Sequence, residues 1–360
     1  AIGGDTLHCL DWIDTEQAHG WLCATRVDTH HHHGTGCTFA TGAAAALALG
    51  HTPADALVLA KMLTHHALTN SHAAGQGPGP VVATQGFAAG PRQGGAPLPW
   101  LSLGRELPWQ LLYSQAEAPV FQVFEPPADG LYGIVDTGER IAQALGTGWR
   151  CLQLRHKARG GLRPHLDQAL EACASAGAVL FINDHWREAL AALSSPAAGP
   201  RLGLHLGQED LLALGTTDRR ALLESRHRLM LGLSSHSLWE LARAAGCGAS
   251  VIACGPVQPT TTKDMPWLAQ GEDNLRWWVA HSPAPVVAIG GLLTPDDVRR
   301  FSGCGPAAVC VVRGLGDSAQ AMASHAPPLR QAVQAGRAPL AADRSSIGYS
   351  ANARLPHPVL

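Results

Sequence analysis

Eight short, largely apolar segments recur through the second half of the chain, and helical stretches of mixed polarity separate them. The segments cover residues 131–135, 151–154, 178–182, 202–206, 229–233, 251–254, 286–289 and 308–312. From the second segment on, a polar residue or a glycine lies at or just beyond each end, at intervals of 23 to 30 residues. One strand, one helix and two short loops need about that length. The pattern therefore predicts a β/α unit repeated eight times between residues 131 and about 318.

A closed barrel of eight parallel strands, the TIM barrel, is the natural arrangement of eight such units. About 188 residues is short for this fold, which usually takes roughly 200 or more. An open doubly wound sheet therefore remains the alternative. Barrel enzymes place their sites at the carboxyl ends of the strands. The polar residues at those ends are the candidates for function.

Residues 1–85 show a different pattern. A Gly-Thr-Gly-Cys turn at 34–37 precedes an alanine-rich run over 39–49, and a second helical pattern covers about 53–68. Thr52 is placed to cap the second helix, and Pro53 suits its first position. We predict a turn and two helices in this segment.

Two further segments have little periodicity. Residues 86–130 are rich in Gly, Pro and Gln but carry scattered aromatic residues such as Trp109 and Phe121. Because disordered chains usually lack such residues, we predict a linker that packs on its neighbours. Residues 319–360 are expected to form a C-terminal tail.

Charge and composition exclude several classes of protein. The 360 residues include 26 Lys and Arg against 28 Asp and Glu, so the bulk charge does not favour nucleic acid or a membrane surface as partner. No apolar run approaches the roughly 18 residues of a membrane span, and no leader pattern opens the chain. The nine cysteines contain no Cys-x-x-Cys pair, which argues for reduced thiols and against zinc. We predict a cytoplasmic protein whose oligomeric state stays open.

Candidate chemistry begins at the end of the second apolar segment. Gln153, Arg155 and Lys157 are spaced by two, so an extended backbone directs all three side chains to one side. One amide and two cations would then line the mouth of the barrel. A solvated strand end is the alternative interpretation of this motif.

Acidic residues follow the next two segments. Asp184 comes after the third segment, and Asp210 lies beyond the fourth. Mg²⁺ is usually held by one or two carboxylates together with phosphate oxygens of a substrate, so these residues predict a magnesium site. Asp210 has an alternative role, because an acidic residue also stabilises the N-terminus of a helix.

Features suited to anions follow the later segments. The loop from Gly255 to Lys263 carries Thr260, Thr261 and Thr262. Glycines follow the seventh segment at 290–291, and the eighth is followed by Arg313-Gly314. Many barrels bind a phosphate at these last two places, with backbone N–H groups that glycine lets a ligand approach. We predict an anion-binding wall here.

Taken in order, these motifs resemble those of thiamine-phosphate synthases. The matching stretches are Gln153-Leu154-Arg155-x-Lys157, Asn183-Asp184, His205-Leu206-Gly207-Gln208-Glu209-Asp210, Gly232-x-Ser234-x-His236, Gly255-Pro256 through Thr260-x-Thr262-Lys263, and Ile289-Gly290-Gly291. The resemblance implies a TIM-barrel transferase with Mg²⁺ as cofactor. Its expected partners are small molecules: the hydroxymethylpyrimidine diphosphate and the thiazole phosphate, which it would join while releasing diphosphate.

The resemblance also implies roles for individual residues. The pyrimidine diphosphate would be held by Gln153, Arg155, Lys157, Asn183 and Lys263, with Arg155, Lys157 and Lys263 as the catalytic cations. Asp184 and Asp210 would hold Mg²⁺, and Ser234 would lie beside the pyrimidine. The thiazole phosphate would be bound by Thr260, Thr262, Gly290 and the backbone of Val312 and Arg313. Arg313 stands where the family commonly has Ser, and the sequence does not decide its effect.

The N-terminal segment resembles the C-terminal third of hydroxymethylpyrimidine-phosphate kinase, a ribokinase-like enzyme. The resemblance rests on residues 26–38 and on the glycines at 75, 77 and 79. It implies an anion hole at Gly34 and Gly36, with Cys37 at the place of the family's proposed base. Because about 85 residues hold only part of such a kinase, we expect no kinase activity. Whether the segment is a trimmed part of a fusion protein or an evolutionary relic of a kinase stays open.

Two other functions remain as alternatives. A barrel that isomerises thiazole phosphates would explain the glycines and the threonine loop, but it would not need the cations and acids at the other strand ends. The second alternative is a non-catalytic sensor that binds the thiazole phosphate or the pyrimidine phosphate. Whether the thiazole substrate is carboxylated stays open. Since every transferase motif lies after residue 131, residues 1–120 are expected to be dispensable for that reaction.

Overall fold

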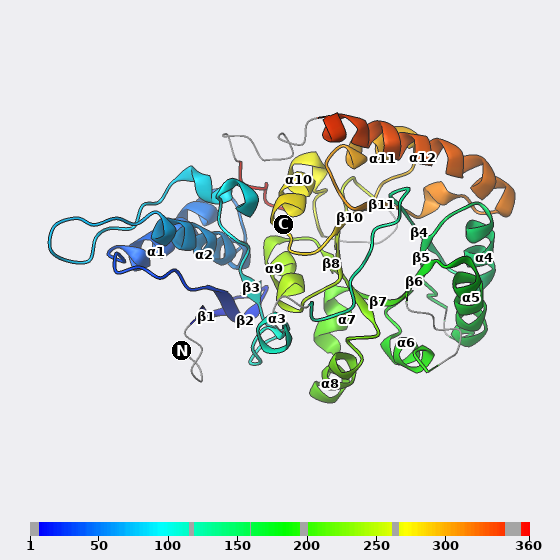
Figure 1. Cartoon of the computed structure of the whole chain (residues 1–360), viewed down its shortest axis with the longest axis horizontal. Coiled ribbons are helices and arrows are strands. Elements are labelled where there is room, and N and C mark those ends of the chain that lie inside the picture. The colour runs from blue at the N-terminus through cyan, green and yellow to red at the C-terminus, as the bar shows by residue number, and fades with distance from the viewer. Residues whose placement is uncertain (1–6, 115–118, 159, 195–200, 261–265, 343–353) are drawn as a thin grey trace.

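A smaller N-terminal unit packs against one side of an eight-stranded barrel (Figure 1). The computed structural model describes residues 7–114, 119–158, 160–194, 201–260, 266–342 and 354–360. Among these residues, no helix combines the length and the apolar character that crossing a bilayer requires.

The barrel strands coincide closely with the eight predicted segments. They are β4 Leu131–Val135, β5 Cys151–Leu154, β6 Val179–Asn183, β7 Leu202–Leu206, β8 Met230–Ser235, β9 Val251–Cys254, β10 Val286–Ile289 and β11 Ala308–Val311. All neighbouring pairs are parallel, and β11 pairs with β4, with Val309 opposite Leu131. This pairing closes the sheet, so the TIM-barrel prediction is confirmed and the open sheet is excluded.

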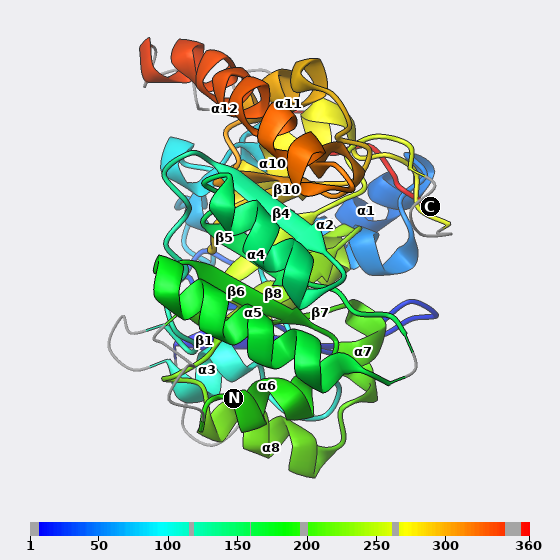
Figure 2. The same ribbon diagram turned by 90° about the vertical axis from the view of Figure 1, so that its right-hand side faces the viewer.

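Helices follow the strands and cover the outside of the barrel. They are α4 Gly138–Gly146, α5 Leu162–Ala176, α6 Trp186–Ala192, α7 Gln208–Ala213, α8 Thr216–Glu224, α9 Leu238–Gly246, α10 Gly271–His281, α11 Pro295–Ser302 and α12 Ala319–Ala342, with the short 3₁₀ helix η3 Arg313–Leu315. Figure 2 shows α4 and α5 on the side away from the N-terminal unit. The leucine-rich outer faces of the strands pack under this layer.

The barrel interior is a separate, partly aromatic core. Phe181 lies at its centre, and the rings of Phe124 and Tyr132 each meet it edge-on with centroids 5.8 Å away. A Cβ atom on Gly203 would lie 2.3 Å from the Phe181 ring, so only glycine fits beside that ring. These side chains thus fill the barrel interior beneath the carboxyl ends of its strands.

The region after residue 318 differs from the predicted tail. Residues 319–342 form α12, which packs on α11 and α4 and completes the eighth β/α unit. Farther along, the backbone N–H of His357 donates to Asn274 Oδ1 at 2.8 Å, and Val359 is buried. The alanine-rich sequence of α12 has a weak hydrophobic periodicity, and its burial comes from neighbouring helices.

The N-terminal unit contains more than the predicted turn and two helices. The helices α1 Thr35–Ala48 and α2 Pro53–Thr69 are present, and the Thr52 side chain accepts from the Asp55 backbone as predicted for a cap. The strands β1 His8–Asp14, β2 His19–Thr25 and β3 Trp100–Leu101 form an antiparallel sheet beside them. Residues 85–114 add the 3₁₀ helices η1 Gln85–Ala88 and η2 Pro91–Gln93 and the helix α3 Trp109–Tyr113. The sheet joins two segments that the sequence pattern separates.

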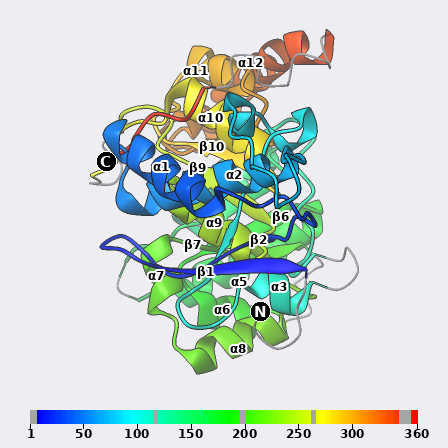
Figure 3. The same cartoon turned by 90° about the vertical axis from the view of Figure 1, so that its left-hand side faces the viewer.

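The N-terminal unit and the barrel share one hydrophobic core. Helix α9 is their common element: all nine of its residues are buried, and it contacts β3, α2 and α3 on one side and β8 on the other. Figure 3 shows α1, α2 and β1 lying in front of the barrel on this side. Removal of the N-terminal unit would therefore expose an apolar helix face.

This packing changes the expectation for a shortened chain. We expect a chain that begins at Pro119 to aggregate, or to melt roughly 10 °C or more below the full chain, because α9 would lose its cover. Thermal unfolding and size-exclusion chromatography of both chains measure the effect. A soluble Pro119 chain with an unchanged melting temperature would contradict it.

Candidate active site

The carboxyl ends of the barrel strands surround one cavity. Eleven of the predicted site residues line it: Gln153, Arg155, Lys157, Asn183, Asp184, Asp210, Ser234, Thr260, Gly290, Val312 and Arg313. Thr262 and Lys263 lie outside the described residues. Gly34, Gly36 and Cys37 are elsewhere, at the start of α1 in the N-terminal unit, where Cys37 is exposed. The structure thus brings together side chains from across the barrel and keeps the kinase-like motif apart.

Strand β5 supplies the polar residues of one wall. Gln153 is 1% exposed and donates its Nε2 hydrogen to the hydroxyl of Tyr132 at 2.8 Å. Arg155 and Lys157 follow at alternate positions and reach the cavity above it. The amide lies deep in the barrel, and the two cations lie closer to solvent.

Two carboxyl groups lie beside these cations. Asp184 follows β6 in the left-handed backbone region, with φ of 64°, and its Oδ2 atom is 2.9 Å from Lys157 Nζ. Asp210 comes from the first turn of α7, and its side chain makes a hydrogen bond with that of Asp184. Strands β5 and β6 end, and α7 begins, at the same edge of the barrel, so these groups lie together.

The electrostatics of this pair favour an additional cation. Burial raises the pKa of Asp210, and the negative charge of Asp184 raises it further. Burial opposes ionisation of Asp184 too, but Lys157, through its hydrogen bond and its charge, together with Asp210 and His205, lowers the pKa of that carboxyl. Two facing carboxyl groups that resist double ionisation are a donor set that a divalent cation suits.

The number of protein ligands points to a particular kind of metal. Within the described part of the chain, no three His, Cys, Asp or Glu side chains gather as a metal site. A cation at Asp184 and Asp210 would have to complete its shell from water and substrate oxygens. Mg²⁺ is commonly bound in this way, so the residues fit the predicted cofactor.

A buried histidine next to the carboxyl groups holds a hydroxyl of the neighbouring strand. His205, on β7, lies with Nε2 3.0 Å from Ser234 Oγ. Burial lowers the pKa of His205 to about 4; the charge of Asp184 opposes this, and that of Arg155 adds to it. The imidazole is therefore neutral near pH 7 and suited to orienting the Ser234 hydroxyl. His205 belongs to one of the sequence motifs, but only this contact gives it a role.

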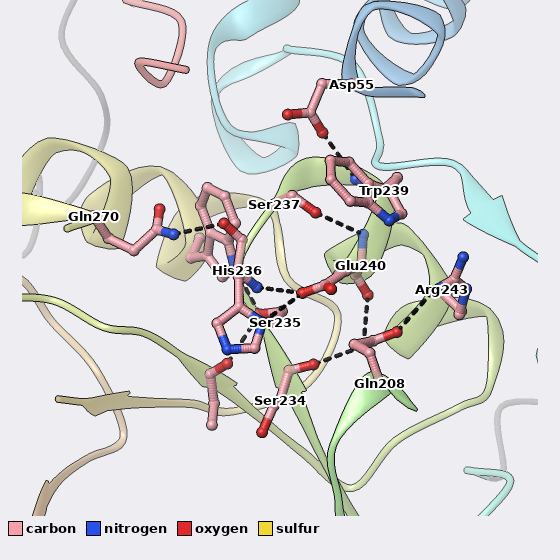
Figure 4. Close-up of polar contacts among 12 residues, drawn as sticks. Asp55, Gln208, Ser234, Ser235, His236, Ser237, Trp239, Glu240, Arg243 and Gln270 are labelled. Carbon is pink, nitrogen blue, oxygen red and sulfur yellow. Dashed lines mark hydrogen bonds and ion pairs between the residues drawn. The ribbon is translucent and has the colours of Figure 1, made fainter. Parts of the chain in front are cut away.

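The turn between β8 and α9 is held by a network that sequence reasoning missed (Figure 4). Glu240 Oε2 accepts from the backbone N–H of His236 at 2.6 Å and lies 2.7 Å from His236 Nδ1. Gln208 Nε2 donates to the Ser234 carbonyl at 2.6 Å, and Arg243 Nη1 donates to Gln208 Oε1 at 3.0 Å. These bonds fix the backbone that carries Ser234 into the cavity.

A glycine-rich wall completes the site on the far side. Gly290 has φ of 97°, and a Cβ atom there would lie 2.7 Å from the Pro256 Cα. The backbone N–H groups of Val257 and Gln258 donate to the carbonyls of Ile289 and Gly290 at 2.8 and 3.1 Å. The loops after β9 and β10 are thus joined, and Gly290 lets them approach closely.

Comparisons with known proteins match the two units of the chain to two families. Residues 131–315 match the family model described as thiamine monophosphate synthase, and residues 2–82 match the one described as phosphomethylpyrimidine kinase. The thiamine-phosphate synthase of Neisseria meningitidis serogroup B is 39% identical over 191 residues, which cover 52% of this chain and 87% of the relative. The thiamine-phosphate synthase of Pectobacterium atrosepticum is 38% identical over 216 residues, which cover 58% of this chain and 92% of the relative. Thiamine phosphate pyrophosphorylase from Pyrococcus furiosus aligns over 57% of this chain and 96% of its own, with 26% identity and a TM-score of 0.46.

A (β/α)₈ barrel whose strand ends bring cations, carboxylates and a glycine wall around one cavity is an enzyme suited to phosphorylated small molecules. The family model and the relatives narrow this class. The chain belongs to the thiamine-phosphate synthase family, and it is a transferase of thiamine biosynthesis. A kinase-like unit precedes the synthase barrel.

Proposed function

We propose that the barrel joins 4-amino-2-methyl-5-(diphosphooxymethyl)pyrimidine to 4-methyl-5-(2-phosphoethyl)thiazole, giving thiamine phosphate and diphosphate; the carboxylated form of the thiazole would give the same products together with CO₂. The observation that carries this proposal is the division of the cavity. Arg155, Lys157, Asp184 and Asp210 lie together on one side, and the Gly290 wall lies on the other. Two anionic groups can therefore be held at separate places within one cavity.

The cationic side suits the pyrimidine diphosphate. Arg155 and Lys157 would contact its phosphates directly, together with Gln153, Asn183 and Lys263. Asp184 and Asp210 would hold Mg²⁺, which when bound neutralises charge on the departing diphosphate. Both cations lie at the end of one rigid strand, so their positions are set before the substrate arrives.

Ser234 suits the pyrimidine ring. Its hydroxyl contacts the neutral His205, and its carbonyl is fixed by Gln208. We propose that this hydroxyl hydrogen-bonds the amino-pyrimidine and orients its methylene carbon toward the thiazole. His205 would act through Ser234 and need not change its protonation state.

The glycine wall suits the thiazole phosphate. Thr260, Thr262, Gly290 and the backbone of Val312 and Arg313 would hold this phosphate, which keeps its charge through the reaction. Backbone N–H groups and hydroxyls bind such an anion without a further cation. Arg313 lines the cavity here and would add a charged contact where the family commonly has Ser.

The reaction needs little acid or base. The bond between the pyrimidine methylene carbon and the diphosphate oxygen breaks, and its electron pair leaves with diphosphate. The thiazole nitrogen then gives its lone pair to the same carbon, so no proton has to move. Catalysis by these residues is positioning and electrostatic stabilisation, since the ring itself stabilises the cation that forms.

Diphosphate release tests the proposed function. With Mg²⁺ and both substrates we expect diphosphate and thiamine phosphate in equal amounts, and with either substrate alone only slow release. An isomerase-like barrel would change the thiazole phosphate alone, and a sensor would bind without turnover. Either of these results would contradict the proposal.

A single methyl group at Gly290 should separate the two anion sites. We expect Gly290→Ala to raise the KM for the thiazole phosphate by about 10- to 100-fold, because a strained backbone and a clash cost about 1–3 kcal/mol. Steady-state kinetics with each substrate varied in turn measure the change.

Gly177→Ala is the matched control. Gly177 ends α5 with φ of 60°, and a Cβ atom there would have no atom within 4 Å. Both kinetic constants should stay within twofold of the parent enzyme, with only a small loss of stability. If Gly290→Ala instead raises only the KM for the pyrimidine diphosphate, the two ends of the cavity have been assigned in reverse.

A further inference from the structure

The N-terminal unit reaches the synthase site through one buried carboxyl group. Asp55 lies in the first turn of α2, is 2% exposed, and points at the N-terminus of α9 (Figure 4). Its Oδ1 atom accepts the backbone N–H of Trp239 at 3.0 Å, and the carboxyl group also accepts that of Leu238.

These bonds complete the cap of α9. The first N–H groups of a helix have no partner within it. Ser237, the N-cap residue, accepts the N–H of Glu240 at 3.4 Å, and Asp55 accepts those of Leu238 and Trp239. Of the first three backbone N–H groups of α9, two therefore have their hydrogen-bond acceptor on a residue of the kinase-like unit.

The carboxyl group is held there against the cost of burial. Burial raises the pKa of Asp55 to about 7, and hydrogen bonds from Trp239 and Leu238 oppose that rise. The negative charge of Glu240, on α9, raises the pKa of Asp55 further. The dipole of α9 acts in the other direction, because the N-terminus of a helix favours a carboxylate. An apolar residue would avoid this cost but would leave two buried donors without a partner.

Two routes join this cap to the cavity. Glu240, one residue after Trp239, is bonded to the backbone and the ring of His236. The Trp239 ring lies 5.4 Å from that of Trp267, which stacks on the His236 ring at 5.3 Å. His236, Trp267 and Glu240 all line the cavity beside Ser234.

We propose that Asp55 is a positioning residue for the transferase: it fixes the start of α9 and thereby the Ser234–His236 turn that faces the pyrimidine. The inference rests on the proposed function of the barrel. The kinase-like unit then has a role in the synthase reaction that does not depend on any kinase chemistry of its own.

Substitution of Asp55 should affect one substrate more than the other. We expect Asp55→Ala to lower kcat/KM for the pyrimidine diphosphate by about 10- to 100-fold, as a small misplacement of a binding group can. The KM for the thiazole phosphate should stay within twofold, because Gly290 lies on the far wall. Asp55→Asn keeps one acceptor oxygen, so it should restore part of the loss.

The matched control is Leu59→Ala, one turn further along α2. Leu59 is also buried in the shared core, but its side chain makes no hydrogen bond to α9. This variant should melt at a lower temperature than the parent while keeping both kinetic constants within twofold. If Asp55→Ala does not fold, Asp55→Asn takes its place and is compared with Leu59→Ala.

The outcomes separate this inference from the proposed function. No thiamine phosphate from the parent enzyme would refute the function itself, whatever the variants do. If the parent is active and the Asp55 variants lose only stability, as Leu59→Ala does, the positioning role is refuted. A loss that falls equally on both substrates would also refute it, because a general loosening of the barrel would explain that result.

Discussion

Asp184→Asn is expected to lower kcat by about 10²- to 10³-fold, the usual cost of removing one preorganised electrostatic group. Asparagine has nearly the same shape, and it is among the residues that tolerate the left-handed backbone found at Asp184. The loss would therefore come from charge. Without that carboxylate, Lys157 loses its ion-pair partner, and the proposed Mg²⁺ site keeps only Asp210.

Metal dependence gives this prediction a second measurement. EDTA should abolish turnover of the parent enzyme, and added Mg²⁺ should restore it. Asp184→Asn and Asp210→Asn should each need a higher Mg²⁺ concentration for half-maximal activity. Asp218→Asn, an acidic residue of α8 that pairs with Arg187 outside the cavity, should leave that concentration unchanged. Full activity of the parent in EDTA would contradict the metal assignment.

Lys157→Ala is the second change with a large expected effect. Negative charge on the diphosphate grows as its bond to carbon breaks, so a cation beside it acts most strongly in the transition state. We expect kcat and kcat/KM for the pyrimidine diphosphate to fall together by about 10²- to 10³-fold, with little change in KM. Steady-state and single-turnover kinetics measure the two constants.

Two comparisons make this result specific. Arg163→Ala removes an exposed cation of α5 that pairs with Asp167 one turn away, and exposed pairs of this kind contribute little. Its kinetics should match the parent. Gly290→Ala should show the opposite behaviour, with a raised KM for the thiazole phosphate. If Lys157→Ala raises only that KM, the β5 side of the cavity is not the diphosphate site.

The eight strands and most of the site could be predicted because their signals are local. Each strand is a short apolar segment, and a parallel barrel places the carboxyl ends of all its strands at one mouth. Residues 30 positions apart in the chain, such as Gln153 and Asn183, could therefore be expected in one cavity from the sequence alone. The chemistry of the site follows from residue type at these ends.

The features that were missed lack such a local signal. Helix α12 is rich in alanine and carries Pro327 and Pro328 in its interior, so its sequence does not read as one long helix. The three-stranded sheet pairs β2 with β3, so that Leu22 lies opposite Leu101, although β3 lies in the segment that the sequence pattern predicts as a linker. The partners of Ser234, namely His205 and Gln208, are polar residues whose contacts depend on how neighbouring strands align.

By itself, the sequence predicted the eight β/α units, the barrel as their natural arrangement and most of the residues that gather at its mouth, because strand periodicity and the geometry of parallel β/α units leave few other arrangements. Only the tertiary structure decided that the kinase-like unit packs on one side of the barrel and caps its helix α9. Asp55 and Trp239 are 184 positions apart, and neither residue carries a pattern that pairs it with the other. Their contact exists because burying α9 between two units leaves its first N–H groups without water, and a carboxyl group from α2 satisfies them.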